Sequence, residues 1–170
     1  RINILRPPPF VAPKEWLATF CSDFSEMFSL MTGSEGFLYT EASKLFEIFG
    51  VWEGSDTYPT IYDLLSFLEN NSYGYRTKEY GYWEVCVNRL RSMTRSLGRM
   101  TQCDKDFMPS LVGRNVVFEM VGLPEEMKTF LANLLLLWMF TLRISRADEN
   151  KDDFVMAMFD PASGRFFSGT

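Results

Sequence analysis

The run from 124 to 145 constrains this chain most, because it is long, nearly all apolar and directly preceded by a short apolar segment. In that segment, residues 116 to 121, only Glu119 is polar, so both faces of a strand formed here would be covered. Doubly covered strands are typical of parallel sheets with helices on both sides. One such strand cannot form a sheet alone, and the sequence therefore indicates part of a larger α/β protein.

The composition indicates one ordinary folded domain. The chain has 170 residues, of which 46% are hydrophobic and 23% charged, so it can bury a sizeable core and is not expected to be disordered. Its net charge of −5 argues against a protein whose whole surface binds nucleic acid, although local basic patches remain open.

Histidine is absent, and the three cysteines, Cys21, Cys86 and Cys103, are far apart. The lack of histidine excludes Ser-His-Asp and Cys-His catalysis and removes the commonest metal ligand. An odd, sparse set of cysteines is neither a disulfide framework nor a zinc motif. We therefore expect a reducing, cytoplasmic location.

The apolar stretch 130–142 is the one segment that resembles a membrane span. It contains Asn133 and Thr141, is flanked by Lys128 and Arg143, and is shorter than the ~20 apolar residues that a span needs. We interpret it as a buried core helix and expect no membrane partner.

Hydrophobic periodicity and end signals predict four helices between residues 13 and 98. Apolar residues recur at steps of three and four over 14–31 and 34–49, and a further helix is predicted over 82–97. Thr60 and Asp63 have the spacing of a capping box and predict where another helix begins.

The expected fold class is mainly α with a small sheet, an incomplete α/β fold in which a helical insertion separates a first strand at 1–6 from a strand–helix unit. Within a single domain spanning 1–170, the expected parts are a four-helix insertion at 13–98, a core strand–helix unit at 114–145 and a β-hairpin tail at 152–170.

Three phrases carry a resemblance to a known family: INILRPPP at the start, PKEWLATF after it, and GRNVVFEMVGLP before the long helix. They resemble the HerA–FtsK branch of P-loop ATPases, ring-shaped motors that pump or unwind DNA, and are most similar to its HerA-like and conjugative-type members. The resemblance covers most of residues 1 to 146. It implies that the chain is the segment between the P-loop and the Walker B strand of an oligomeric DNA translocase or helicase.

Two departures limit what the resemblance implies about chemistry. The chain has no GxxxxGK[ST] motif to cradle phosphates. Residues 154 to 160 have the apolar-then-acidic form of a Walker B strand, but Pro161 stands where a glutamate is expected, and Val121 where family members often carry an acidic residue. We therefore expect no catalytic residue, no cofactor-binding residue and no ATP hydrolysis here; ATP and Mg²⁺ would be bound by the rest of the parent protein.

An arginine row provides the candidate contact with DNA. Arg91, Arg95 and Arg99 are spaced by four, so they share one face if the helix extends that far, and Arg89 lies in the same region. Such a row could contact phosphates. It could equally be a solvated helix face, or pair with acidic residues such as Glu41, Glu47 or Asp104.

Two acidic residues invite a functional interpretation beside a structural one. Glu119, within its apolar strand, is predicted to be a buried carboxylate that senses nucleotide or subunit contacts; the structural alternatives are an edge position or an ion pair with Arg114 or Arg143. Asp160 is a weak candidate for a Mg²⁺-coupling aspartate, although Asp-Pro followed by Ala-Ser-Gly is also ordinary turn chemistry. No metal site is otherwise predicted.

The tyrosines at 73, 75, 80 and 82, beside Arg76 and Lys78, resemble a stacking platform for single strands, but they could equally fix a loop to the core. Two functions stay open. The chain is either a segment of a HerA-like ATPase, whose partners are the remainder of that ATPase or identical subunits, or a stand-alone helical module derived from one, which binds a protein through exposed apolar surface.

Overall fold

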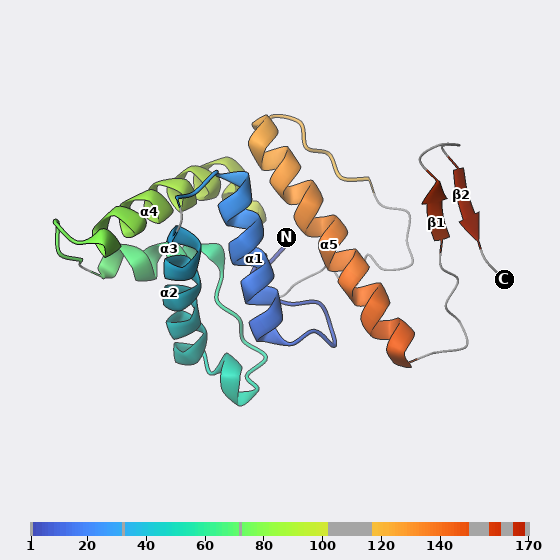
Figure 1. Cartoon of the computed structure of the whole chain (residues 1–170), viewed down its shortest axis with the longest axis horizontal. Coiled ribbons are helices and arrows are strands. Elements are labelled where there is room, and N and C mark those ends of the chain that lie inside the picture. Colours follow the sequence, from blue (N-terminus) through green and yellow to red (C-terminus); the bar gives the residue numbers. More distant parts are fainter. Residues whose placement is uncertain are drawn as a thin grey trace.

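A computed structural model describes the backbone of residues 2–31, 33–71, 73–101, 117–149, 157–160 and 165–168, and describes side chains as far as Ile144 with the exception of Arg99. Five α-helices account for most of these residues (Figure 1). They are α1 (Pro13–Met27), α2 (Ser34–Ile48), α3 (Ile61–Asn70), α4 (Lys78–Leu97) and α5 (Glu125–Glu149). Two short 3-10 helices, η1 (Val51–Glu53) and η2 (Gly98–Met100), follow α2 and α4.

The expected fold class, mainly α with a small sheet, is wrong, because the described body of the molecule is all helical. Residues 2–6 are irregular rather than a strand, and so are residues 117–120 before a turn at 121–122. Two four-residue segments, β1 (Ala157–Asp160) and β2 (Arg165–Ser168), pair antiparallel and only with each other. They add no layer to the helical body.

Residues 2–6 form part of the core through side-chain bonds that a strand would not make. Asn3 is buried, and its Oδ1 accepts a hydrogen bond from the backbone N–H of Leu5 at 3.1 Å. The Trp16 indole N–H donates to the Ile4 carbonyl at 3.0 Å, which ties the segment to α1. The backbone N–H of Ile2 donates to the Met100 carbonyl at 2.8 Å. These local bonds satisfy the backbone in place of a sheet ladder.

The helix boundaries follow ordinary end signals. Thr60 caps α3: its hydroxyl accepts from the Asp63 N–H, and the Asp63 carboxylate accepts from the Thr60 N–H at 2.7 Å, which confirms the predicted capping box. Pro13 occupies the first turn of α1, where a missing N–H costs nothing. Before α2, Gly33 has φ of +98°, and a side chain there would meet Tyr82 at 2.6 Å.

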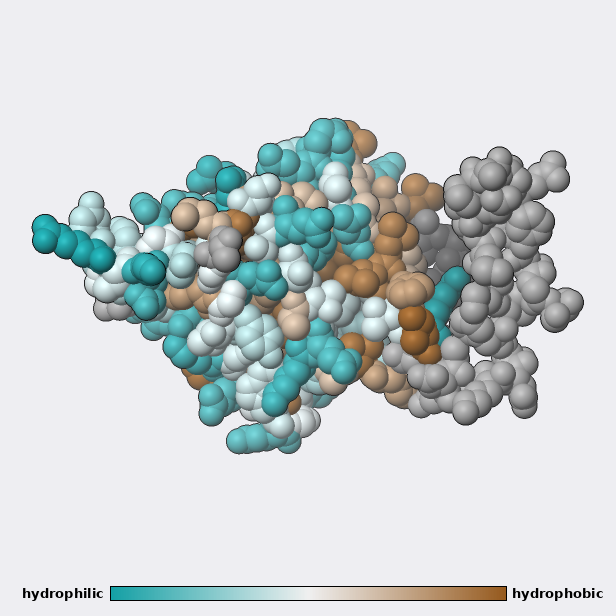
Figure 2. Space-filling model, in the orientation of Figure 1, coloured by the Kyte–Doolittle hydropathy of each residue, from teal (hydrophilic) through white to brown (hydrophobic). Residues whose placement is uncertain are grey.

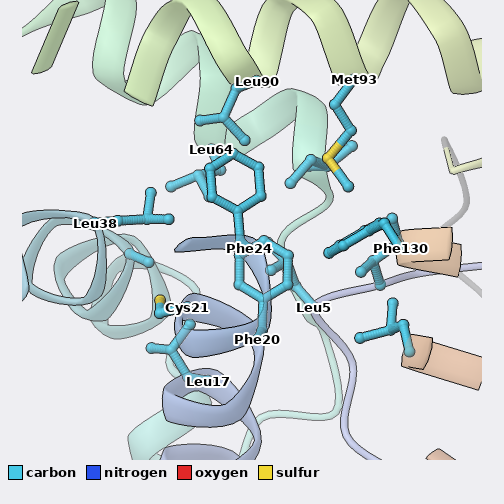
Figure 3. Close-up of a cluster of buried hydrophobic side chains, with 14 of the residues drawn as sticks. Leu5, Leu17, Phe20, Cys21, Phe24, Leu38, Leu64, Leu90, Met93 and Phe130 are labelled. Atoms are coloured by element: carbon cyan, nitrogen blue, oxygen red, sulfur yellow. The ribbon is translucent and has the colours of Figure 1, made fainter. Parts of the chain in front are cut away.

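Helix α1 lies between α2 on one side and α5 on the other, and α4 crosses the ends of the layer (Figure 1). The core centres on Phe20 and Phe24 of α1, which reach toward Leu90 of α4 and Phe130 of α5 (Figure 3). The Phe24 and Phe130 rings meet edge to face with centroids 6.4 Å apart, a favoured aromatic geometry. One contiguous core therefore connects the N-terminal helices to α5.

Candidate interaction surface

Helix α5 has two apolar faces, of which the structure buries one. The inward face packs on α1 and α4 and contains the fully buried Phe130. Its other buried members are Met127, Leu131, Leu134, Leu135, Trp138 and Leu142. The buried core helix that we predicted over 130–142 is therefore buried along one side only.

The opposite face of α5 exposes large apolar side chains. Leu136 and Phe140 are each 62% exposed, and Ile144 is 44% exposed. The three recur at steps of four, so they form one stripe along the helix. Met139, 41% exposed, lies beside it. In the space-filling view, hydrophobic colour gathers over the part of the body where α5 runs (Figure 2). We call Leu136, Met139, Phe140 and Ile144 the outer face of α5.

A groove runs between the outer face and α1. It has a volume of about 490 Å³ and is lined by Asp23 of α1 with Asn133, Leu136, Leu137 and Phe140 of α5. Burial, and secondly the neighbouring Glu26 carboxylate, raise the pKa of Asp23 above its ordinary value. The Asp23 Oδ2 atom is buried without a hydrogen-bond partner among the described residues. The wall of the groove is thus mainly apolar, with Asp23 and Asn133 as its polar members.

The segment that leads into α5 extends the apolar surface. Val117 is 88% exposed and Val121 is 93% exposed, while Met120 and Leu123 pack against the core. Glu119 is also exposed, so the predicted buried carboxylate is wrong. A carboxylate in water needs no ion pair, and the reason for assigning it a special role disappears. Its suggested partner Arg143 is exposed as well, and Arg114 lies outside the described residues.

Helix α5 also meets a simple test for a membrane span. By length and composition alone, Glu125–Ile144 could cross a bilayer, although 39% of its most apolar 18-residue stretch is buried inside the protein. One such helix is weak evidence, because the core helix of a soluble protein passes the same test.

Arg89, Arg91 and Arg95 of the arginine row lie in the C-terminal half of α4, whereas Arg99 falls in η2 after α4 has ended. Part of the row is occupied by contacts within the protein. The Arg91 Nε atom donates to Glu69 Oε1 at 2.7 Å, a partner that differs from the three we suggested from the sequence. The Arg89 guanidinium lies 5.7 Å from the centre of the Phe28 ring. Arg95 is exposed, and the side chain of Arg99 lies outside the described part.

The tyrosine cluster is fixed to the body of the protein through ring contacts. Tyr73 meets Phe37 edge to face at 5.3 Å and Trp83 at 6.2 Å, and Tyr80 packs on Trp83. The Trp83 indole N–H donates to the Leu68 carbonyl at 2.8 Å. Tyr75, at 78% exposure, is the most open of the cluster. The contacts match the interpretation in which the rings fix a loop to the core.

No metal centre is evident among the described side chains, where no three acidic or cysteine residues lie close enough to hold an ion. Asp160 ends β1 and lies opposite Arg165 in the pairing, but its side chain is outside the described part.

Comparison with known proteins finds no matching family model, no matching curated protein and no matching solved structure. The role of the outer face of α5 therefore rests on the geometry of this chain alone. The sequence did not reveal this face, because a helix that is apolar on all sides has the same residue pattern whether neighbouring elements bury one of its sides or both. The available signal was the spacing of Leu136, Phe140 and Ile144, which is offset from that of Phe130, Leu134 and Trp138.

Proposed function

We propose that this chain is a helical interaction unit that docks onto a protein partner through the outer face of α5. The observation that carries the proposal is the pair Leu136 and Phe140, each 62% exposed on a helix whose other side is core. Soluble proteins rarely expose large contiguous apolar patches, and such patches mark sites where a partner binds.

The partner that we propose is the remainder of a HerA-like P-loop ATPase. In an α/β protein, helices pack against both faces of a central sheet. Here α5 has an apolar face toward the helical body and presents a second one to solvent. A sheet supplied by the rest of the ATPase would cover that second face, and it would supply the P-loop that this chain lacks.

The first experiment asks whether the coding frame upstream of Arg1 encodes a GxxxxGK[ST] motif. Where it does, hydrogen exchange is measured for residues 133–144 in the 170-residue chain and in the longer protein. We expect stronger protection in the longer protein, because docking would bury the outer face. Equal exchange in both would contradict docking through α5.

Substitutions then locate the surface. A Leu136→Glu, Phe140→Glu double variant places charge on the outer face and is expected to release the docked partner or, in the isolated chain, to reduce self-association measured by light scattering. The matched control is Met31→Glu, Ile48→Glu, which adds the same charge at exposed apolar positions outside α5 and outside the segment that leads into it.

Liposome flotation distinguishes the membrane alternative. Flotation of the wild-type chain with vesicles of neutral and anionic phospholipid, abolished by the α5 double variant, would assign the outer face to a lipid surface and overturn the protein-docking proposal. We expect the chain to remain in the unbound fraction.

A further inference from the structure

The groove between α1 and α5 contains a carboxylate that the protein itself does not pair. Asp23 of α1 lines this groove beside Asn133, Leu136, Leu137 and Phe140 of α5. No ion pair among the described side chains includes Asp23. The Asp23 Oδ2 atom is closed to solvent and has no hydrogen-bond partner among them. The groove therefore holds one carboxylate without a cation in a mainly apolar wall.

The surroundings of Asp23 oppose its charge. The side chain is half-buried, and burial raises the pKa of its carboxyl group, with the neighbouring Glu26 carboxylate as the second cause. No cation among the described residues acts on this group in the opposite direction. A carboxylate withdrawn from water is stable as an anion only when a cation or hydrogen-bond donors compensate it. Asp23 thus gains from a positive charge that a partner brings.

Asp23 lies where the docked partner would lie. Leu136 and Phe140 line the groove and also belong to the outer face of α5, and α1 runs beside α5 (Figure 1). A partner that covers the outer face therefore covers the groove as well and removes more water from Asp23. A carboxylate enclosed in this way without a cation weakens binding, whereas a complementary charge selects the correct partner.

The groove suits lysine better than arginine. Because Oδ2 of Asp23 is closed, Oδ1 is the oxygen that a partner can reach. Arginine is best matched to a carboxylate that offers both oxygens, since its guanidinium donates two parallel hydrogen bonds. The lysine ammonium is a compact charge on a four-carbon stem that packs on apolar surface. Leu136 and Phe140 supply such a surface, and the Asn133 side-chain oxygen offers a second acceptor.

We infer that the docking partner inserts a lysine into the groove between α1 and α5, where its ammonium pairs with Asp23 Oδ1 and its stem lies on Leu136 and Phe140. The inference rests on the proposed function, because it concerns the same face of α5, and adds the chemistry of the contact. Asp23 then selects a partner that carries a positive charge at this point.

Hydrogen exchange of residues 133–144 in the longer protein tests the pair. Asp23→Asn keeps the size of the side chain but removes its charge, and we expect the protection that docking gives to fall at least about tenfold. Asp23→Lys places two cations together and should lower the protection further. Glu26→Gln is the matched control, because Glu26 is an exposed carboxylate on the same helix that does not line the groove. It should leave the protection within about twofold.

The isolated 170-residue chain separates a contact with the partner from a role in folding. Asp23 has no cation there, so Asp23→Asn should not lower the stability measured by urea denaturation and circular dichroism. Reduced protection in the longer protein with undiminished stability of the isolated chain would support the pair. An equal loss of stability in the isolated chain would assign the effect to folding and overturn the inference.

Cross-linking identifies the second residue of the pair. A water-soluble carbodiimide joins a carboxylate directly to a lysine amine in contact with it. In the wild-type longer protein we expect mass spectrometry to find Asp23 linked to a lysine outside residues 1–170, and we expect no such link in Asp23→Asn. Protection that depends on Asp23 but occurs without this cross-link would overturn the assignment of lysine.

The inference and the docking proposal fail in different ways. Protection of residues 133–144 in the longer protein that neither Asp23→Asn nor Asp23→Lys reduces would overturn the lysine contact and leave docking through the outer face intact. The same exchange in the wild-type longer protein as in the isolated chain, or a coding frame that encodes no longer protein, would contradict the docking proposal and the inference with it.

Discussion

The ring of Phe130 on α5 meets the ring of Phe24 on α1 edge to face, with the centroids 6.4 Å apart (Figure 3). Phe130 is fully buried and also contacts Phe20 and Phe28 at the same centroid distance. One side chain thus connects α5 to Phe20 and Phe24 of α1 and to Phe28, the residue that caps the C-terminal end of α1. This contact holds the inner face of α5 in place and so determines which residues remain on its outer face.

Replacing Phe130 by alanine should therefore destabilise the whole fold. A buried phenylalanine truncated to alanine loses transfer free energy and leaves a cavity, which costs about 3–5 kcal/mol. The measurement is the free energy of unfolding from urea denaturation followed by circular dichroism. Phe140→Ala is the matched control, because it is the same change on the same helix at 62% exposure. It should change stability by less than about 0.5 kcal/mol. Equal losses of stability in the two variants would show that α5 packs on the helical body through a different face.

The start of α3 gives a second prediction. Thr60→Ala removes a hydroxyl that accepts from the Asp63 N–H and leaves an unsatisfied donor in the first turn. We expect a loss of about 1 kcal/mol in the free energy of unfolding. Thr57→Ala, at an exposed position just before the cap, should have almost no effect. A loss as large at Thr57 as at Thr60 would assign the effect to the loop and not to the cap.

Local signals predicted the helical part of the fold well. The helix expected over 34–49 occurs as Ser34–Ile48, and the capping box at Thr60 is present. The signals failed where tertiary contacts decide. Residues 2–6 are apolar enough for a strand, but the Asn3 side chain bonds to its own backbone neighbour and replaces a sheet ladder. Around Glu119, the apolar pattern was equally consistent with a segment exposed to solvent, as the structure has it. Periodicity does not reveal whether another element packs over a segment.

The candidate sites were harder to predict than the helices. Arg91 and Arg95 of the arginine row lie on α4, but α4 ends before Arg99, and Glu69, the partner of Arg91, is 22 positions away and comes from α3. The groove beside the outer face joins Asp23 of α1 with Asn133, Leu136, Leu137 and Phe140 of α5. Contacts between residues of different helices depend on the angles at which the helices pack. The spacing of residues along one sequence does not reveal these angles.

Arg91 provides a third prediction. Its ion pair with Glu69 is half exposed, so Arg91→Gln should reduce the free energy of unfolding by less than about 1 kcal/mol. Because Arg91 is paired and Arg89 lies on Phe28, we expect the same weak affinity for double-stranded DNA before and after the change. Fluorescence anisotropy over a salt series measures this, with Arg95→Gln as the exposed control. A salt dependence that falls by about one unit of slope per arginine removed would instead indicate phosphate contacts.

Asp23 predicts a dependence of stability on pH. Its pKa in the folded protein is raised above the ordinary value of 3.8, first by burial and then by Glu26. The folded state therefore binds a proton more readily than the unfolded state, and Asp23 lowers stability as pH rises from the unfolded to the folded pKa. Asp23→Asn should remove this loss. Its stability relative to wild type should increase between pH about 4 and neutral pH, as measured by urea denaturation. Glu26→Gln should show the same trend more weakly, and a gain that is constant with pH would refute the assignment.

The two described cysteines predict slow thiol chemistry in the native state. Cys21 and Cys86 are buried, and burial raises the pKa of Cys86 to about 12 and raises the pKa of Cys21 as well. The thiolate is the nucleophile, so both side chains should resist Ellman's reagent near pH 8, at which a free cysteine, with pKa about 8.5, reacts readily. Cys103 lies outside the described residues, so the Cys103→Ser variant is used to follow the other two alone. We expect its two thiols to react only at the rate of unfolding, and at once in denaturant. Immediate reaction of either thiol in the native variant would mean that the α1–α4 core opens far more easily than its packing implies.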